Sequence, residues 1–311
     1  MSMTKSCASL RADAERLPHL YRAHGLTISL PFACNDLSPA DAEAIPDVVV
    51  REGDIPDSLS DARVSTAMHD ASPDAYLLRG GPAAGRFLAR NGDSILFERG
   101  PECDETRFQH ILLHPMMAAL LRQRDLFVLH ASGVVGPGGV VLICGDSGAG
   151  KSTTAAALTR LGLPLQTDDV SALRLDEKGG IEVPAGAGHV HLFEAASHAL
   201  AFDTQGLTQN AWHRMKMAVP ALVERERGGA RLRRIVHLER GPVPTVQVDR
   251  ITGRAKLPLL LNSVFGPYLI EAIAPRAMLV ARALQNVEML RITRPDGEWT
   301  MDAVVAAILA D

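Results

Sequence analysis

One run of eight residues carries the clearest chemical pattern in this sequence. From Gly145 to Ser152 the chain reads GDSGAGKS, which fits the phosphate-binding pattern G-x-x-x-x-G-K-S. Glycines let successive backbone N–H groups converge on phosphate oxygens, and a helix that begins at the loop adds partial positive charge. In such loops the lysine neutralises the β- and γ-phosphates, and the hydroxyl that follows ligates Mg²⁺. The sequence therefore predicts a Mg-ATP site formed by Gly145, Asp146, Ser147, Gly148, Ala149, Gly150, Lys151, Ser152 and Thr153.

The residues on either side of this loop favour the same interpretation. The unbroken apolar run over residues 140–144 is typical of a strand buried on both faces. The alanine-rich segment over residues 151–161 predicts a helix, and Gly162 is placed as its C-terminal stop. A strand before the loop and a helix after it are the context that this pattern requires.

Two adjacent carboxylates form a second candidate element. Asp168 and Asp169 follow a strand predicted over residues 163–167. Ligands in α/β folds bind at the carboxyl ends of strands. Adjacent carboxylates also repel each other, which favours placing at least one of them on a metal or another cation. We interpret the pair as a metal ligand and a general base, with an ordinary turn as the alternative.

Three further residues give weaker evidence for a functional role. His130 ends a predicted strand, and its spacing alone indicates a structural residue. Glu182 and Glu194 are candidate metal or substrate contacts, although surface carboxylates are far commoner than functional ones.

Taken together, these residues resemble the catalytic domain of HPr kinase/phosphorylase. Three linked segments carry the resemblance, namely residues 130–133 (HASG), residues 145–152 (GDSGAGKS) and residues 167–169 (TDD). Lys151 lies 21 residues after His130, and Asp169 lies 18 residues after Lys151, which agrees with the family without gaps.

The resemblance implies an α/β fold related to phosphoenolpyruvate carboxykinase and a role for each matched residue. Asp169 would accept the proton of a serine hydroxyl, His130 would assist it, and Asp168 would lie near Mg²⁺. Residues 182–188 faintly echo the family's Glu-x-Arg-Gly-Leu-Gly signature, and this echo implies a metal role for Glu182. The segment departs from the family in having no arginine. Lys151 would act on the phosphoryl group that is transferred.

A closer resemblance is to the HPr-kinase-like enzymes of lasso-peptide biosynthesis, which phosphorylate the C-terminal serine of a precursor peptide. It extends to residues 21–26, to a β-rich N-terminal region and to residues 129–132. It implies an ATP-dependent serine kinase whose partner is a ribosomal peptide precursor. A kinase for a folded protein such as HPr, a small-molecule kinase, and a slow ATPase that serves as a nucleotide-gated binding protein stay open. The oligomeric state is open too, with a homo-oligomer among the options.

The segments that must position these residues fall into three parts. Short strands and turns fill residues 1–103, where Asn91-Gly92 between two apolar runs predicts a hairpin. Residues 104–125 have apolar side chains at helical spacing, and Pro115 is expected to kink or interrupt that helix. Strands and helices alternate over residues 126–311, with a final helix expected over residues 301–309, which is typical of an α/β domain. We expect a small β-rich domain, a helical connector and a P-loop catalytic domain in that order.

Composition narrows the classes of protein. Hydrophobic residues make up 47% and charged residues 22%, as in folded soluble proteins. The net charge of -4 provides no field that attracts nucleic acid or an anionic membrane. The four cysteines show no paired spacing, and the sequence has neither a secretory signal nor the ~18 consecutive apolar residues that span a bilayer. We expect a cytoplasmic protein with reduced thiols that binds neither nucleic acid nor membrane.

Overall fold

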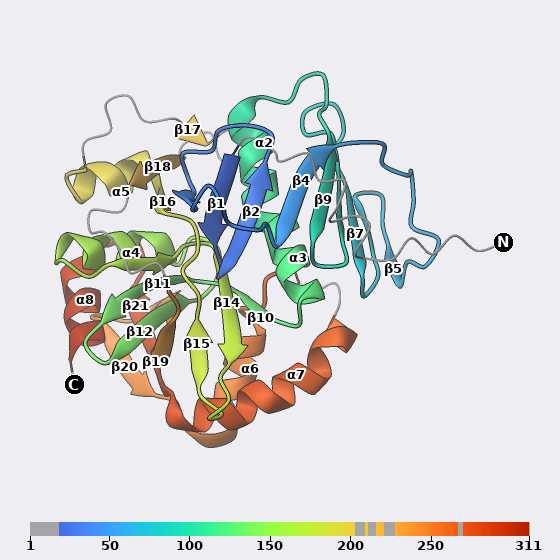
Figure 1. Cartoon of the computed structure of the whole chain (residues 1–311). Helices are drawn as coiled ribbons and strands as arrows, with labels where there is room; N and C mark the ends of the chain where they lie inside the picture. Colours follow the sequence, from blue (N-terminus) through green and yellow to red (C-terminus); the bar gives the residue numbers. More distant parts are fainter. Residues whose placement is uncertain (1–18, 203–208, 211–215, 221–227, 267–269, 311) are drawn as a thin grey trace.

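The computed structural model describes residues 19–202, 209–210, 216–220, 228–266 and 270–310 (Figure 1). Within them the chain is a mixed α/β structure with two large sheets. The first sheet has the strand order β3-β1-β2-β4-β9-β8-β7-β6-β5. Its strands are β1 (His19–Ala23), β2 (Leu26–Leu30), β3 (Ser38–Pro39), β4 (Val48–Glu52), β5 (Val64–Ser65), β6 (His69–Ala71), β7 (Ala75–Arg79), β8 (Arg86–Arg90) and β9 (Ser94–Glu98). The strand-rich character predicted for the first hundred residues is confirmed over residues 19–98.

The predicted hairpin is present in this sheet. β8 and β9 pair in antiparallel fashion, with Arg90 opposite Ser94. Asn91 and Gly92 between them have φ angles of 55° and 69°. Glycine and asparagine tolerate this left-handed region, which a tight hairpin turn requires.

A helical segment follows, and Pro115 changes its geometry without ending it. The segment consists of α2 (Glu105–Ile111), the π-helical turn η1 (Leu112–Met116) and α3 (Met117–Gln123). The Asp104 side chain caps its start by accepting a hydrogen bond from the Arg107 N–H. In a regular α-helix the proline ring would clash with the carbonyl four residues earlier, and the wider π-turn relieves that clash. The expected interruption is therefore a local widening.

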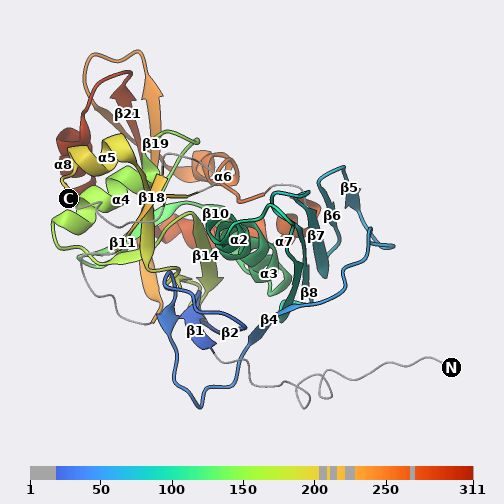
Figure 2. The same ribbon diagram turned by 90° about the horizontal axis from the view of Figure 1, so that it is seen from above.

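This helical segment is the centre of a core that both large sheets share. Phe108 is fully buried, and its ring lies 5.3, 5.4 and 4.8 Å from those of Phe32, Phe87 and Phe97. The same cluster of buried side chains includes Val128 of the second sheet. Viewed from above, α2 and α3 lie between the two sheets (Figure 2). The segment predicted as a connector is thus core structure.

The second sheet has the strand order β10-β14-β15-β19-β12-β11-β13, with β21 paired to β19 and β20 paired to β21. Its strands are β10 (Phe127–His130), β11 (Ser132–Gly136), β12 (Gly139–Cys144), β13 (Leu165–Thr167), β14 (Val170–Leu175), β15 (Ile181–Val183), β19 (Ala230–Gly241), β20 (Gln247–Arg250) and β21 (Glu288–Pro295). β11 was not predicted, and it forms a hairpin with β12. β12 runs parallel to β19, which in turn runs parallel to β21.

β12 is buried on both faces, as its apolar run predicts. Val140, Leu142 and Cys144 belong to one core cluster, and Val141 and Ile143 belong to another on the opposite face. Burial raises the pKa of the Cys144 thiol to about 11, so this cysteine behaves as a small hydrophobic residue.

Helices cover both faces of the second sheet. α4 (Lys151–Arg160) and α8 (Met301–Leu309) pack on one face, and α7 (Ile270–Ala283) packs on the other. The bounds of α8 match the prediction. The remaining elements are β16 (His189–Phe193), α5 (Glu194–Ala199), β17 (Gln209–Asn210), β18 (Lys216–Pro220), η2 (Gly253–Ala255), α6 (Lys256–Leu261) and η4 (Leu284–Asn286). β16, β18 and β17 form a three-stranded sheet.

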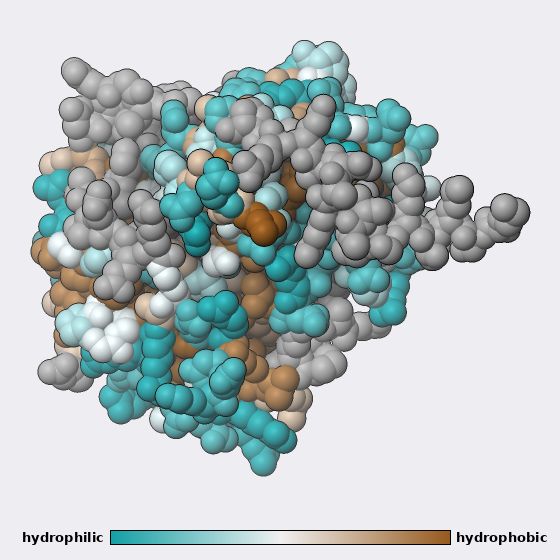
Figure 3. Space-filling model, in the orientation of Figure 1, coloured by the Kyte–Doolittle hydropathy of each residue, from teal (hydrophilic) through white to brown (hydrophobic). Residues whose placement is uncertain are grey.

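The surface agrees with the composition. The face shown in Figure 1 is mostly hydrophilic, with hydrophobic residues in scattered groups (Figure 3). Among the described residues, no helix combines the length and the apolar character that crossing a bilayer demands.

Candidate functional site

The predicted phosphate loop leaves the C-terminal end of β12 and enters α4. Gly145, Gly148 and Gly150 have φ angles of 137°, 80° and 108°, a region that side chains disfavour. Gly145 also packs closely, because a Cβ there would lie 2.1 Å from the carbonyl oxygen of Leu238 on β19. Residues 146–148 are exposed at the tip of the loop. The strand, loop and helix thus have the arrangement that the motif predicts.

Lys151 is held inside this loop. Its side chain is buried, and Nζ donates hydrogen bonds to the carbonyl oxygens of Gly145 at 3.0 Å and Asp146 at 3.1 Å. The ammonium group therefore lies against the start of the loop. In that position it can neutralise an anion that the loop amides bind.

The start of α4 suits a phosphate and a magnesium ion. Gly150 is the N-cap residue, and no side chain caps the helix there. The N–H groups of the first turn and the helix dipole therefore face the loop side without a side-chain acceptor. Ser152 and Thr153 lie in this turn and are half-buried. A hydroxyl oxygen beside bound phosphates is a ligand that Mg²⁺ accepts. The residues present thus fit a magnesium nucleotide.

Two buried basic side chains lie on the neighbouring strands, one of them bonded to the loop, and sequence reasoning missed both. Arg294 of β21 donates from Nε to the carbonyl oxygen of Ala149 at 3.0 Å, and burial lowers its pKa. His237 of β19 lies opposite Cys144, where burial lowers its pKa below the ordinary value. Nothing local in the sequence marks either residue, because each reaches the loop only through the pairing of β12, β19 and β21.

Two strand pairs bring the predicted carboxylates to the same place. His130 on β10 lies opposite Val170 on β14, and Gly133 on β11 lies opposite Thr167 on β13. The segments 130–133 and 167–170 therefore run side by side where both chains pass from one strand to the next. Ser132 also lies opposite Ile143 on β12, about 5 Å away between Cα atoms by antiparallel geometry. The aspartate pair is thus beside the strand end from which the phosphate loop leaves.

Asp168 is buried and firmly held. Its Oδ1 accepts a hydrogen bond from the Ser132 hydroxyl at 2.5 Å, and its Oδ2 accepts one from the backbone N–H of His191 at 3.0 Å. Nδ1 of His191 also lies 3.9 Å from Oδ2. Two of the sequence-predicted motifs, HASG and TDD, are joined by the bond to Ser132.

Asp169 is also buried, and two histidines face its two oxygens. Oδ1 lies 3.9 Å from Nδ1 of His130, and Oδ2 lies 3.5 Å from Nε2 of His114. Its backbone has a φ angle of 60°, in the left-handed region that aspartate adopts more often than most other non-glycine residues. The structure thus brings together the predicted pair His130 and Asp169.

Three histidines near this pair were not predicted. His114 lies in the π-helical turn η1, His110 lies in α2, and His191 lies in β16. The imidazole rings of His110 and His114 are 4.2 Å apart, and those of His114 and His191 are 5.3 Å apart. The four-residue spacing of His110 and His114 on a predicted helix was a usable signal. His191 had none, because β16 meets these residues only in the folded chain.

Glu182 is not brought to this group. Its Oε2 accepts hydrogen bonds from Arg174 at 2.8 and 3.3 Å, on the paired strands β14 and β15. Arg174 lies four residues along β14 from Val170, which is about 13 Å in a strand. Glu194 begins α5, where its carboxylate lies 3.9 Å from His198.

The assembled site can bind an anion, hold a dication and accept a proton. The loop amides and Lys151 carry positive charge, and Ser152 and Asp168 carry oxygen atoms of the kind that a dication accepts. Asp169 supplies a carboxylate between two imidazoles. Phosphoryl transfer needs these three functions, since its catalysis comes mainly from positioning and electrostatic stabilisation.

Comparison with known proteins adds little to this picture. No protein-family model and no curated protein matches the chain. Among solved structures, the chain is similar to the HPr(Ser) kinase/phosphatase from Coxiella burnetii, with a TM-score of 0.29 and 14% identity. That match covers 58% of this chain and 87% of the other. The likeness is weak, and we base no functional argument on it.

Proposed function

We propose that this protein is a Mg-ATP-dependent kinase that phosphorylates a serine hydroxyl. The observation that carries the proposal is the position of Asp169. Its buried carboxylate, flanked by His130, lies beside the strand end from which the phosphate loop leaves. A nucleotide loop without an adjacent base would serve ATP binding alone, whereas a carboxylate at this position can receive the proton of an acceptor hydroxyl.

The residues of the loop would hold the nucleotide in the proposal. The amides of residues 145–151 and the Lys151 ammonium would stabilise charge on the transferring phosphoryl group. Ser152 would hold the magnesium ion, and Asp168, fixed by Ser132 and His191, would complete its oxygen ligands. Mg-ATP would supply the phosphoryl group and neutralise the charge that builds up on it.

Asp169 would orient the serine hydroxyl and take its proton. His130 lies half-exposed at the end of β10, so it can contact both the carboxylate and an incoming acceptor. Glu182 has no part in this scheme, because it is bonded to Arg174 away from the loop.

The acceptor in the proposal is a serine near the end of a ribosomal peptide precursor. Two features support it, namely the resemblance of the sequence to the lasso-precursor kinases and the absence of an arginine in residues 182–188. A short flexible tail can enter a site lined by loops and become ordered there, whereas a folded protein needs a matching docking surface. Such a reaction belongs in the cytoplasm, where ATP and nascent peptides are present.

The test compares three acceptors under the same conditions. The protein is given Mg-ATP with a serine-ended precursor peptide, its serine-to-alanine variant, or HPr, and the mass of each acceptor is followed. The proposal expects a phosphate on the serine peptide alone. A phosphate on HPr alone would replace the peptide by a folded acceptor. ATP turnover that no acceptor changes would favour a nucleotide-gated binding protein instead.

A further inference from the structure

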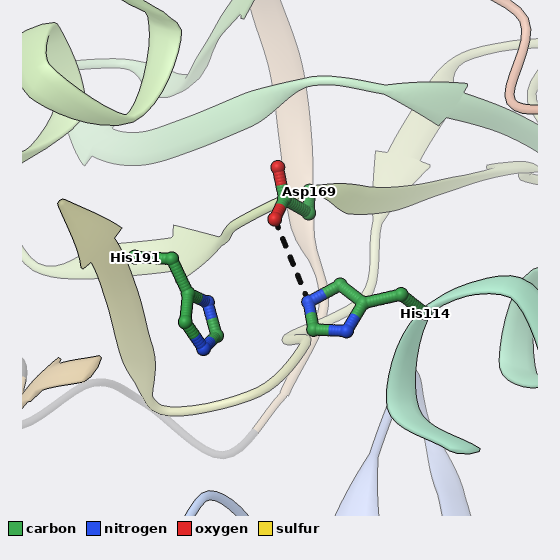
Figure 4. Close-up of side chains that lie close together, drawn as sticks. All are labelled: His114, Asp169 and His191. Carbon is green, nitrogen blue, oxygen red and sulfur yellow. Dashed lines mark ion pairs between the residues drawn. The ribbon is translucent and has the colours of Figure 1, made fainter. Parts of the chain in front are cut away.

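A group of three buried side chains adjoins the proposed transfer site. His114 of η1, Asp169 and His191 of β16 come from three separate parts of the chain, and each is 6 to 7% exposed. One ligand atom from each residue lies within 4.8 Å of the other two. Figure 4 shows the two imidazoles and the carboxylate converging.

The hydrogen bond of His114 determines which of its two ring nitrogens carries the hydrogen and which has the lone pair. Nδ1 lies 2.8 Å from the carbonyl oxygen of His110. A carbonyl only accepts, so Nδ1 carries the hydrogen and donates it. In the neutral imidazole, Nε2 therefore has its lone pair on the side of Asp169 Oδ2, 3.5 Å away. A cation placed between the two atoms would be bound by this lone pair and by the carboxylate oxygen.

The separation of these atoms fits a metal ion better than a shared proton. A charge-assisted N–H to carboxylate hydrogen bond spans about 2.7–2.9 Å. Two ligands at a tetrahedral angle, each about 2.1 Å from a zinc ion, lie about 3.4 Å apart. His114 and Asp169 have nearly this spacing at 3.5 Å. The ligand atom of His191 lies within 4.8 Å of the other two, so this imidazole would complete the group as the third ligand.

The surroundings of the three side chains hold them as metal ligands are commonly held. Metal-binding histidines donate their second N–H to a carbonyl or carboxylate, as His114 does to His110. The backbone of His191 is fixed by its bond to Asp168. His114 lies in a π-helical turn and Asp169 has a left-handed backbone, two local departures that are frequent at functional sites.

We propose that His114, Asp169 and His191 bind one divalent transition-metal ion of the zinc class. Two imidazoles and one carboxylate suit such ions, whereas Mg²⁺ prefers oxygen ligands throughout. Three protein ligands leave a position open for water or a substrate oxygen, as in catalytic rather than structural zinc sites. This site does not include Ser152, and it adjoins the proposed magnesium ligand Asp168, whose Oδ2 lies 3.9 Å from Nδ1 of His191. It shares Asp169 with the proposed base, but binding of the metal needs no nucleotide.

The test measures metal binding by the full-length protein, freed of metal with a chelator, in the absence of ATP. Co²⁺ is titrated in and its visible absorption recorded, and Zn²⁺ is then added to displace it. We expect one histidine-dependent Co²⁺ per chain. His114→Ala and His191→Ala should each weaken binding at least ~10–100-fold, the loss seen even for residues that only orient a ligand. His198→Ala, on an exposed helix end, and Ser152→Ala should leave it unchanged.

Two outcomes would overturn the proposal directly: no Co²⁺ binding at all, or Co²⁺ binding that both His114→Ala and His191→Ala retain. A third would be Co²⁺ binding that Ser152→Ala abolishes and the two histidine variants do not. Circular dichroism checks that each variant folds, and His191→Gln replaces any alanine variant that does not. The test does not depend on kinase activity. A protein that binds Co²⁺ through these histidines but transfers no phosphate would support the metal site and contradict only the proposed function.

Discussion

At the scale of single residues, the proposal rests on a few charged side chains beside the phosphate loop. Lys151 is held by two loop carbonyls, and Asp169 is held between His114 and His130. Neither residue belongs to an apolar core cluster. Changing either one should therefore affect chemistry much more than folding.

Lys151→Ala should abolish most phosphoryl transfer while the protein stays folded. Loss of one charge contact in the transition state costs ~3–4 kcal/mol, or a rate decrease of about 10²–10³. Transfer to the serine peptide is measured at saturating ATP, with Lys178→Ala on an exposed turn as the control. Near-normal transfer by a folded Lys151→Ala variant would remove this lysine from the mechanism.

Asp169→Asn should preserve nucleotide binding and slow transfer by about 10²–10⁴, the usual contribution of a general base. Asp168→Asn should act differently, by raising the Mg²⁺ concentration needed for half-maximal rate. Rates over a Mg²⁺ series separate the two variants. If Asp169→Asn transfers normally and Asp168→Asn is inactive, the roles of the two aspartates are reversed.

At the scale of elements, the loop depends on how closely it lies against β19. A Cβ at Gly145 would meet the Leu238 carbonyl oxygen at 2.1 Å, whereas a Cβ at Gly148 would meet nothing within 4 Å. Both glycines have positive φ angles, 137° at Gly145 and 80° at Gly148, so each alanine variant is strained, and the Gly145 variant also clashes with β19.

Gly148→Ala should therefore fold with a loss of about 1–2 kcal/mol, the cost of a left-handed alanine. Gly145→Ala should lose more stability and should bind ATP much more weakly, because the loop must move off β19. Thermal unfolding and calorimetric titration with ATP test this pair. Equal thermal stability and equal ATP affinity of the two variants would contradict the close packing of the loop against β19.

In the first sheet, a buried ion pair joins β6 and β7. Asp70 accepts hydrogen bonds from Arg79 at 2.5 Å, Ser65 at 2.7 Å and the Leu59 N–H at 2.9 Å. The bond from Arg79 is the main reason that the pKa of Asp70 is lowered to about 2. Asp70 and Arg79 both lie within residues 1–103, the first of the three predicted parts of the chain. The division of the chain at residues 103 and 125 stays a prediction.

The stability that Asp70 contributes should disappear on acidification. An unfolded aspartate has a pKa of about 3.9, so below about pH 5 the unfolded chain binds more protons than the folded one, and stability falls as pH decreases toward 2. Asp70→Asn should lose about 2 kcal/mol at pH 7, as for a hydrogen bond to a charged group. Urea unfolding from pH 7 to pH 2 measures this. If the difference in unfolding free energy between Asp70→Asn and the wild type did not decrease in acid, this explanation would be wrong.

At the scale of the whole molecule, the helical segment between the sheets joins the two halves. Phe108 contacts aromatic side chains of the first sheet, and its core cluster continues into β10 and β14. The site residues His110, His114 and His130 lie on or next to this shared core. A substitution that disrupts packing in this core should therefore destabilise both sheets.

Phe108→Ala should reduce stability by about 3–5 kcal/mol, as for other large-to-small changes in a core. Hydrogen exchange should increase in peptides from both the β8–β9 hairpin and β10. Phe193→Ala, at a side chain that is 41% exposed, is the matched control. Faster exchange confined to the first sheet would show that the two halves unfold independently.

Much of the local structure was predictable because it depends on contiguous residues. The glycine loop, its flanking strand and helix, the Asn91-Gly92 hairpin and the final helix all follow from short-range rules of turn geometry and burial. The strand β11 was missed because its glycines and valines lie between stronger signals. Pro115 was expected to kink or interrupt the helix, and the chain accommodates it in a wider π-helical turn instead.

By itself the sequence determined the phosphate loop, the aspartate pair and their spacing from His130, because each lies within a continuous motif. Only the tertiary structure decided that Arg294 supports the loop, that Glu182 lies away from it, and that His114 and His191 meet at Asp169. These contacts join residues from separate strands and a helix. They depend on strand register and on packing of the helical segment between the sheets, and no local pattern in the chain encodes either.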